Sequence, residues 1–201
     1  MPETNAQNPQ PVEPVEPQVR MLDAHSLRGL AHPLRIRLLG ALRLHGPATA
    51  SRLAERLGES SGATSYHLRQ LAAYGFVEDA PEHGKGRERW WRASHDGTGF
   101  DESLIHAADP ETRVAADVFL AEIAKMHAQE LAGWMNEAQN WSQDWRRGSD
   151  LSDFTLRLTA DQSLELIHKL HDLINGYRDL PRSEGAETVR FHTHAFPRHT
   201  E

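Results

Sequence analysis

The sequence contains no cysteine, and this absence removes several classes of function at once. Disulfide bonds, thiolate metal sites, thiol redox switches and cysteine nucleophiles are all excluded. Apolar runs are only a few residues long, far short of the roughly 20 residues that a membrane-spanning helix needs. The N-terminus also lacks a basic segment followed by an apolar one, as a secretion signal would have. We therefore expect a cytoplasmic protein with no membrane partner.

Catalytic motifs are missing as well. The sequence has no phosphate-binding loop, no dinucleotide fingerprint and no nucleophile elbow. Most carboxylates of the second half fall at positions where a helix would expose them to solvent. The sequence therefore predicts neither an enzyme nor a cofactor.

Positive charge is scarce overall but unevenly distributed. The net charge is -7 at pH 7. Residues 20–95 nevertheless carry 12 Lys and Arg against 7 Asp and Glu, whereas residues 96–201 carry 10 against 19. Such asymmetry suggests a basic module that meets a polyanion and an acidic module with another task.

Helical periodicity begins near Leu22 and recurs in four segments separated by helix-breaking residues. Pro33 suits the first turn of the second helix, Thr49 is a good N-cap for the third, and Gly58 ends it. Gly75 ends the fourth. The expected helices cover residues 22–31, 33–45, 49–57 and 61–74.

After Gly75 the apolar period changes to that of strands. Residues 76–79 and 88–93 flank a turn over 82–87 that is rich in glycine and positive charge, which predicts a hairpin with a basic tip. Three helices followed by a hairpin form the winged helix-turn-helix arrangement, and the third and fourth predicted helices, about three residues apart, are its helix-turn-helix pair. In it the second helix of the pair, here the fourth predicted helix, enters the major groove of DNA.

This recognition helix has two distinct faces. Thr64, Leu68 and Leu71 form the inward stripe. The outer face is polar and starts with small residues: Ser61, Gly62, Ser65, Tyr66 and Arg69. Small groups allow close approach to base edges, Tyr66 can stack or hydrogen-bond, and Arg69 is placed for a phosphate or a guanine. Ser60, Ser61 and the free amides of the first turn suit a phosphate oxygen.

Residues 30–39, which read LAHPLRIRLL, resemble the opening of ArsR-type winged-helix repressors. Residues 53–58, 64–71 and 75–77 resemble that family's third helix, recognition helix and entry to the wing. The resemblance covers about residues 22–93 and implies a sequence-specific, DNA-binding transcriptional regulator, with repression as its expected effect. Carried over by position, it implies base contacts from Ser61, Gly62, Ala63, Ser65 and Tyr66. It implies contacts to the DNA backbone from Thr49, Ser51, His67, Arg69, Lys85, Arg87 and Arg89.

Metal sensing is where the chain departs from this family. Many members bind metals through cysteine pairs in the third helix, or through Asp, His and Glu on the last helix. His127 and Glu130 supply half of the second pattern, but Val114 and Ala116 stand where its partners belong. Two further pairs have spacings that could hold zinc or nickel: His168 with His171, and His192 with His194. We predict no metal site and keep a histidine-based, metal-responsive repressor as an alternative.

The second half begins with a long helix expected from Pro110 to about Trp145. Because one recognition helix contacts only a few base pairs, we expect a homodimer that reads two half-sites of double-stranded DNA. The long helix is the natural dimer interface, through Val118, Phe119, Ile123, Met126 and Trp134. An unidentified small-molecule effector could bind against Trp134, Trp141 and Trp145.

A small strand-helix-strand unit is expected to follow. Residues 154–158 alternate apolar and polar side chains, a helix runs from a cap at Thr159 or Asp161 to about Tyr177, and residues 189–196 form a second strand. Two strands are too few to be stable alone, so we expect them to pair with another subunit.

Taken by region, the sequence predicts a mainly α fold with a small β component. Residues 1–19, rich in Pro, Gln, Glu and Asn, are expected to be a disordered tail. Residues 20–95 form the winged helix-turn-helix domain, and residues 96–201 form a dimerisation and effector domain. The remaining alternative is a winged-helix module that docks proteins. The polar face of the recognition helix and the basic wing favour DNA, because a docking module would expose apolar residues there.

Overall fold

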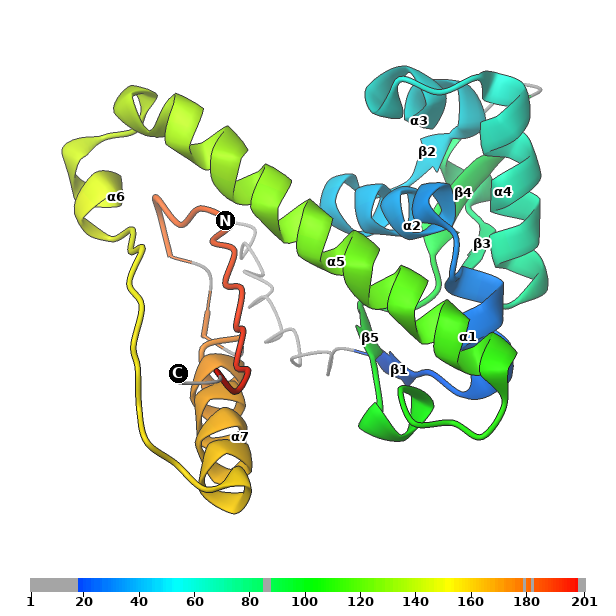
Figure 1. Ribbon diagram of the computed structural model, residues 1–201. Coiled ribbons are helices and arrows are strands. Elements are labelled where there is room, and N and C mark those ends of the chain that lie inside the picture. Colours follow the sequence, from blue (N-terminus) through cyan, green and yellow to red (C-terminus); the bar gives the residue numbers. More distant parts are fainter. Residues whose placement is uncertain (1–17, 85–87, 179, 182, 199–201) are drawn as a thin grey trace, which may run out of the picture. The chain divides into compact units, whose positions relative to one another are not determined.

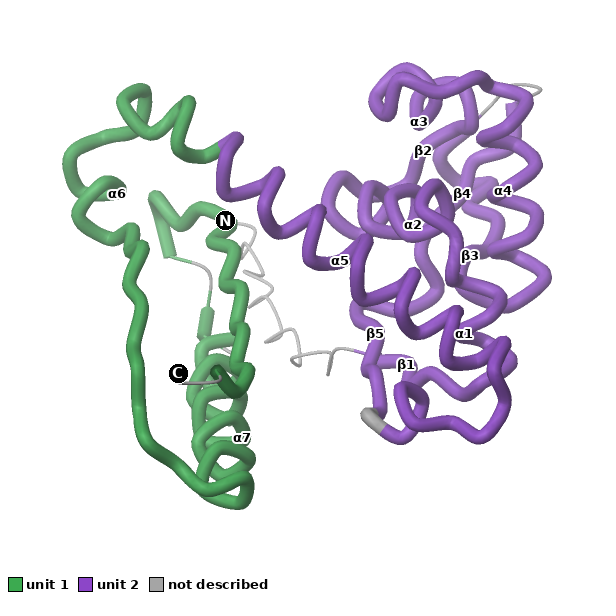
Figure 2. The backbone as a smooth tube through the Cα atoms, viewed as in Figure 1, with its two compact units in different colours: residues 1–15, 134–201 green, residues 16–133 purple. Residues whose placement is uncertain are grey.

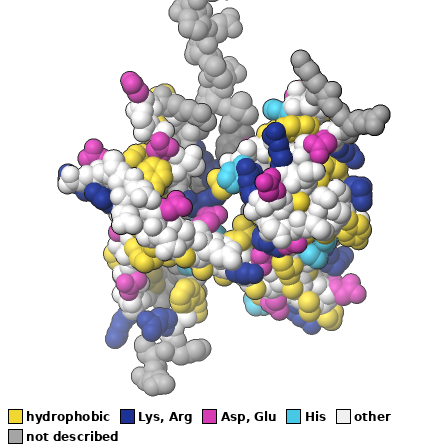
Figure 3. Space-filling model, turned by 90° about the horizontal axis from the view of Figure 1, so that it is seen from above, with side chains coloured by type: hydrophobic (Ala, Val, Ile, Leu, Met, Phe, Trp, Pro, Cys, Tyr) yellow, Lys and Arg dark blue, Asp and Glu magenta, His cyan; other side chains and the backbone are white. Residues whose placement is uncertain are grey.

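The computed structural model describes residues 18–84, 88–178, 180–181 and 183–198 (Figure 1). The chain divides into two compact units, one spanning Glu16–Gly133 and the other taking in the residues from Trp134 onward (Figure 2). The described residues are mainly helical with two small sheets, which confirms the predicted fold class. Apolar and charged side chains are interspersed at the surface (Figure 3). Among the described helices, none has both the length and the apolarity needed to cross a bilayer.

Four helices form the first part of the larger unit. The third has the N-cap that the sequence predicts, Thr49. Asp23 accepts a hydrogen bond from the amide of Ser26 at the start of the first helix. Gly58, with a φ of 66°, ends the third. Their bounds are α1 (Ala24–Leu30), α2 (Pro33–His45), α3 (Ala50–Leu57) and α4 (Ser61–Ala73).

Five short strands and two 3-10 turns complete the larger unit. β3 (Val77–Asp79) and β4 (Trp90–Ala93) form the predicted hairpin, and β2 (Ala48–Thr49) pairs with the other edge of β4. β1 (Val19–Met21) runs parallel to β5 (Gly97–Gly99). The 3-10 turns are η1 (Pro81–His83) and η2 (Glu102–Leu104). The sequence does not predict the strands β1, β2 and β5, which have two or three residues each.

One apolar core joins these elements, and it includes the long helix α5 (Pro110–Glu137). Leu27, Leu38, Leu53, Leu68 and Leu71 are completely buried. From α5, the side chains that enter the same core are Ala115, Ala116 and Phe119. The first turns of α5 therefore pack as part of the helix-turn-helix unit.

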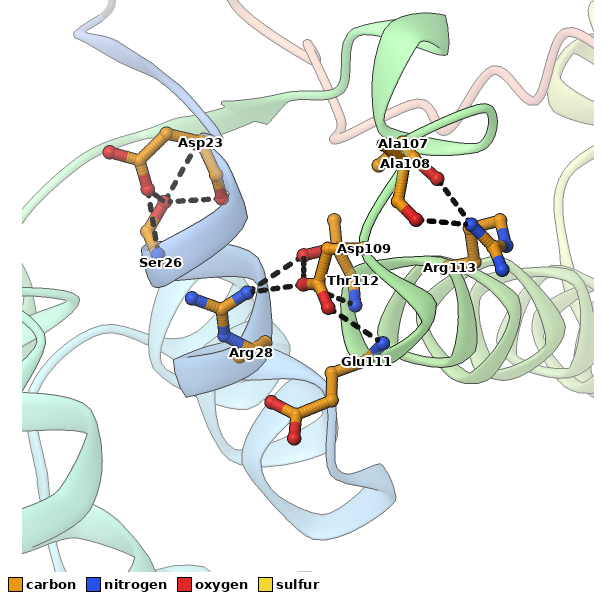
Figure 4. Close-up of polar contacts among 9 residues, drawn as sticks. All are labelled: Asp23, Ser26, Arg28, Ala107, Ala108, Asp109, Glu111, Thr112 and Arg113. Carbon is orange, nitrogen blue, oxygen red and sulfur yellow. Dashed lines mark hydrogen bonds and ion pairs between the residues drawn. The ribbon is translucent and has the colours of Figure 1, made fainter.

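The beginning of α5 is tied to α1 by polar contacts (Figure 4). Nη1 of Arg28 donates to Oδ2 of Asp109 at 3.0 Å and to the hydroxyl of Thr112 at 2.7 Å. Asp109 also accepts hydrogen bonds from the amides of Glu111 and Thr112, and so closes the first turn of the helix. The side chain of Thr112 is fully buried by these contacts.

The long helix is shorter than predicted. It ends at Glu137 and is followed by η3 (Ala138–Asn140) and α6 (Gln143–Arg147). The physical reason is a second cap: the hydroxyl of Ser142 accepts a hydrogen bond from the amide of Trp145 at 3.3 Å and starts a new helix.

In the smaller unit, the predicted helix is present as α7 (Ala160–Gly176), with Thr159 and Gln162 forming a capping box. Residues 154–158 and 189–196, predicted as strands that pair with another subunit, belong to no sheet within the described part of this chain, so their pairing stays a prediction. A strand exists only by pairing with another, and the described part of this chain offers these segments none.

Candidate nucleic-acid interface

The predicted recognition helix is α4, and its inward stripe is confirmed. Thr64, Leu68 and Leu71 are each fully buried against the core. Three residues, 58–60, connect α3 to α4, and the hydroxyl of Ser60 caps α4 by accepting from the amide of Ala63 at 3.2 Å. The β3–β4 hairpin follows, so helix, turn, helix and wing lie in the expected order (Figure 1).

The outer face of α4 is open and polar. Ser61, Gly62, Tyr66 and Arg69 are exposed, and Ala63 and Ser65 are half-buried. A Cβ atom added at Gly62 would meet nothing within 4 Å. A ligand can therefore approach the backbone of the first turn closely.

A shallow groove of about 220 Å³ brings several predicted residues together. Ser65 and Arg69 of α4 line one side of it, and Ser51 of α3 and Arg89 of the wing line the other. Its remaining lining residues are Thr49, Ala50, Glu88 and Trp91. The groove lies where the first turn of α3, the outer face of α4 and the wing converge.

Two residues implied by the resemblance are occupied by structural tasks. Thr49 is only 2% exposed, and its hydroxyl caps α3 by accepting from the amide of Arg52. His67 is half-buried, and its ring centroid lies 4.3 Å from that of His32. Burial lowers the pKa of both histidines below the ordinary value. Their imidazole rings are therefore biased toward the neutral form and carry little positive charge for a phosphate.

The cations of the wing fall into two groups. Lys85 and Arg87 lie outside the described residues. Arg89 is bound from Nε and Nη2 by the carboxylate of Asp79, and its guanidinium carbon lies 4.0 Å from the centre of the Trp91 ring. The hydrogen bond raises the pKa of Arg89 and lowers the pKa of Asp79. A phosphate that reaches Arg89 must therefore compete with an existing carboxylate.

Sequence reasoning missed the acidic partners at this site. The hydroxyl of Ser51 donates to Oε1 of Glu88 at 2.9 Å, which joins α3 to the wing. Arg52, also on α3, lies 4.8 Å above the ring of Trp90. The register of the hairpin could have predicted one such acidic partner near the site, because it places Glu78 opposite Arg92 on the neighbouring strand.

Three of the five residues predicted for the dimer interface pack against the core of their own chain: Phe119, Ile123 and Met126. Phe119 is 7% exposed and stacks on Phe100 at 5.5 Å. Ile123 and Met126 pack against the same core, and Val118 is half-buried. The apolar side chains Ala115, Ala116 and Phe119 of α5 thus belong to the core of their own chain. Trp134 remains 37% exposed.

The other predicted features lie in the smaller unit or close to it. The rings of Trp141 and Trp145 meet edge to face at 6.2 Å, and those of His192 and His194 are 6.4 Å apart. Nε2 of His171 lies 3.3 Å from the hydroxyl of Thr193. Within the described ranges, no three His, Cys, Asp or Glu residues come together as a metal site would require.

Comparison with known proteins gives one family match and two low-similarity solved structures. Residues 30–80 match the family model described as a helix-turn-helix domain. RV1404 from Mycobacterium tuberculosis has a crystal structure that aligns at 17% identity and a TM-score of 0.30, over 75% of this chain and 79% of the other. A ZitR mutant from Lactococcus lactis, in its apo form, aligns at 15% identity and 0.29, over 72% and 83%.

No curated protein matches the chain. The family-model match covers the end of α1, all of α2, α3 and α4, and β3. Residues 30–80 therefore form a helix-turn-helix domain.

Proposed function

We propose that this protein is a sequence-specific transcriptional regulator, a repressor of the ArsR type, that binds double-stranded DNA as a homodimer through α4 and the wing. The observation that carries the proposal is the groove lined by Ser51, Ser65, Arg69 and Arg89 beside the open polar face of α4. As such a regulator the protein would act in the cytoplasm, and its sequence carries none of the catalytic motifs sought above.

The two sides of the groove suit different parts of DNA. Along α4, Ser65 and Arg69 lie about one helical turn apart and Tyr66 follows Ser65, so two hydroxyls and a guanidinium are available to base edges. Gly62 leaves room for the helix to enter the major groove closely. Ser51, at the first turn of α3, and Arg89 on the wing are placed for flanking phosphates.

Dimerisation gives the second half-site. The face of α5 opposite its buried stripe is a suitable contact, since it is exposed and, apart from Asp117, carries small or aliphatic residues at steps of seven, three, four and three: Val114, Ala121, Ala124, Ala128 and Leu131. That spacing is the one used by paired helices, and small residues permit close approach of the two backbones.

The test is a selection of bound sequences from a random DNA library. We expect an enriched site with two-fold symmetry, and we expect Ser65→Ala and Tyr66→Phe to change its sequence. Arg69→Gln and Arg89→Gln should weaken binding, the second of them on all sequences alike. Arg92→Gln is the matched control, because Arg92 pairs with Glu78 and Glu82 and does not line the groove. Recovery of no enriched sequence would refute the proposal.

A further inference from the structure

The segment from Leu151 to Leu158 has the properties of a strand without a partner. It contains neither proline nor glycine, and its apolar side chains Phe154, Leu156 and Leu158 alternate with polar ones. All three are well exposed, Phe154 by 83%. In the described part of the chain, no backbone-to-backbone hydrogen bond involves these residues. Such an edge readily pairs with another chain.

The neighbouring helix has an uncovered apolar face as well. None of the 17 residues of α7 is buried, and Leu164, Leu170 and Leu173 are 54%, 41% and 62% exposed. Isolated helices of this length are marginal in water, and packing of an apolar face normally stabilises them. The smaller unit therefore lacks a covering surface that a partner would provide.

The charges of the segment identify the partner. In an antiparallel pair, directly opposed residues point to the same face of the sheet, and successive residues of a strand point to opposite faces. Two identical strands related by a two-fold axis therefore oppose residues that are an even number of positions apart. The axis then passes through the residue midway between them. An axis at Thr155 places Asp153 opposite Arg157 of a second copy and Arg157 opposite the second Asp153. The same register opposes Phe154 to Leu156 and Thr155 to itself. Each of these cross-strand pairs is favourable, and an axis at Phe154 or Leu156 pairs neither charge with its opposite.

We infer that residues 151–158 of two copies of this chain pair as antiparallel strands about a two-fold axis at Thr155. This inference takes from the proposed function only that the protein is a homodimer. It adds a contact surface between the two copies, in the smaller unit. One dimer contains both this contact and the contact through α5 only if the two contacts share the same two-fold axis.

The absence of cysteine makes the test direct. In the full chain, Thr155→Cys introduces one thiol that can form a disulfide only between two chains. Opposed residues of antiparallel strands have Cα atoms about 4.5–5.5 Å apart, within the range of a disulfide. Ser152→Cys is the matched control, because the same register separates its two copies by about 20 Å. We expect mild oxidation to cross-link most of the first variant and little of the second. Equal cross-linking of the two variants, or none of the first, would overturn the inference.

Charge exchange provides a second measurement that needs no oxidation. Asp153→Arg and Arg157→Asp should each raise the dissociation constant of the dimer about two- to thirty-fold, since each disrupts two cross-strand pairs. The double variant should recover it, and a mixture of the two single variants should form heterodimers. If the charge-exchange variants leave the dissociation constant of the dimer unchanged and Thr155→Cys fails to cross-link, the inferred pairing of residues 151–158 is wrong. DNA binding by each variant at saturating protein concentration reports separately on the groove, so the two proposals can fail independently.

Discussion

Arg89 at the wing donates hydrogen bonds to both carboxylate oxygens of Asp79, and the Nη2 to Oδ2 distance is 2.7 Å. The same guanidinium lies over the ring of Trp91 and lines the groove. Arg89 is therefore fixed in position before any ligand arrives, but its charge is partly compensated.

The first prediction concerns this pair. Asp79→Asn should tighten DNA binding at low salt, because the phosphate then meets an uncompensated guanidinium. Arg89→Gln should weaken binding and reduce the magnitude of the slope of log affinity against log salt by about 0.9 per lost contact. Fluorescence anisotropy over a salt series measures both. An unchanged slope for Arg89→Gln would show that this side chain does not reach phosphate.

The second prediction separates helix stability from DNA contact. Gly62→Ala should stabilise the protein by about 0.5–1 kcal/mol, since alanine is favoured over glycine in a helix and the space around Gly62 is open. It should nevertheless weaken DNA binding by filling the surface of closest approach. Gly133→Ala on α5, which also meets nothing within 4 Å, should stabilise without affecting DNA. Thermal unfolding measures the stability of the two variants, and fluorescence anisotropy measures their DNA affinity. Equal DNA affinities of the Gly62→Ala variant and the parent protein would argue against insertion of the first turn of α4 into the major groove.

The third prediction is a dependence of stability on pH. Burial lowers the pKa of His32 and of His67 below the ordinary value of 6.5. Between 6.5 and the lowered value the unfolded chain binds more protons than the folded one, so the free energy of unfolding falls as pH falls through that window. His45 and His95 shift in the same direction through burial. Urea unfolding at about pH 7.5 and about pH 5.5 measures the loss.

The His67→Gln variant tests the source of this dependence, because glutamine does not titrate. Its unfolding free energy should fall less between the same two pH values. A difference between pH values as large as that of the parent protein would assign the effect to the other histidines.

The fourth prediction separates the two faces of α5. Phe119→Ala should lower the free energy of unfolding by about 3–5 kcal/mol, since the side chain is buried against Phe100 and the core. Ala124→Glu, on the exposed face, should leave the fold intact and weaken dimerisation. Chemical denaturation and sedimentation velocity distinguish these effects. An unchanged dissociation constant for the dimer of the Ala124→Glu variant would exclude this face as a contact.

Local sequence signals predicted most of the helix-turn-helix unit, because its helices begin and end at residues with strong backbone preferences. Ser60 caps α4 through its hydroxyl, and Gly58 and Gly75 adopt positive φ angles of 66° and 71° after their helices. These effects act within a few residues and can be read without knowing the fold. The same is true of the inward stripe of α4.

Signals that depend on distant partners were less informative. The apolar period of α5 indicates a buried face, but only the structure places Phe119 against Phe100. The alternation around Phe154 is that of a strand, yet a strand forms only by pairing, and neither sheet of the described chain includes this segment. The sequence does not predict the ion pair between Asp79 and Arg89, since this pair depends on the geometry of the hairpin.

The attachment of α5 to α1 through Arg28 and Asp109 has a consequence for building chimaeric regulators. A graft that stops after the hairpin at Ala93 would expose the core surface that Ala116 and Phe119 cover. A transferable cassette should extend to at least Met126, whose side chain packs near Gly40 of α2. The junction to a foreign sensing domain then falls within a continuous helix, so its length fixes the rotational phase of the attached domain at about 100° per added residue.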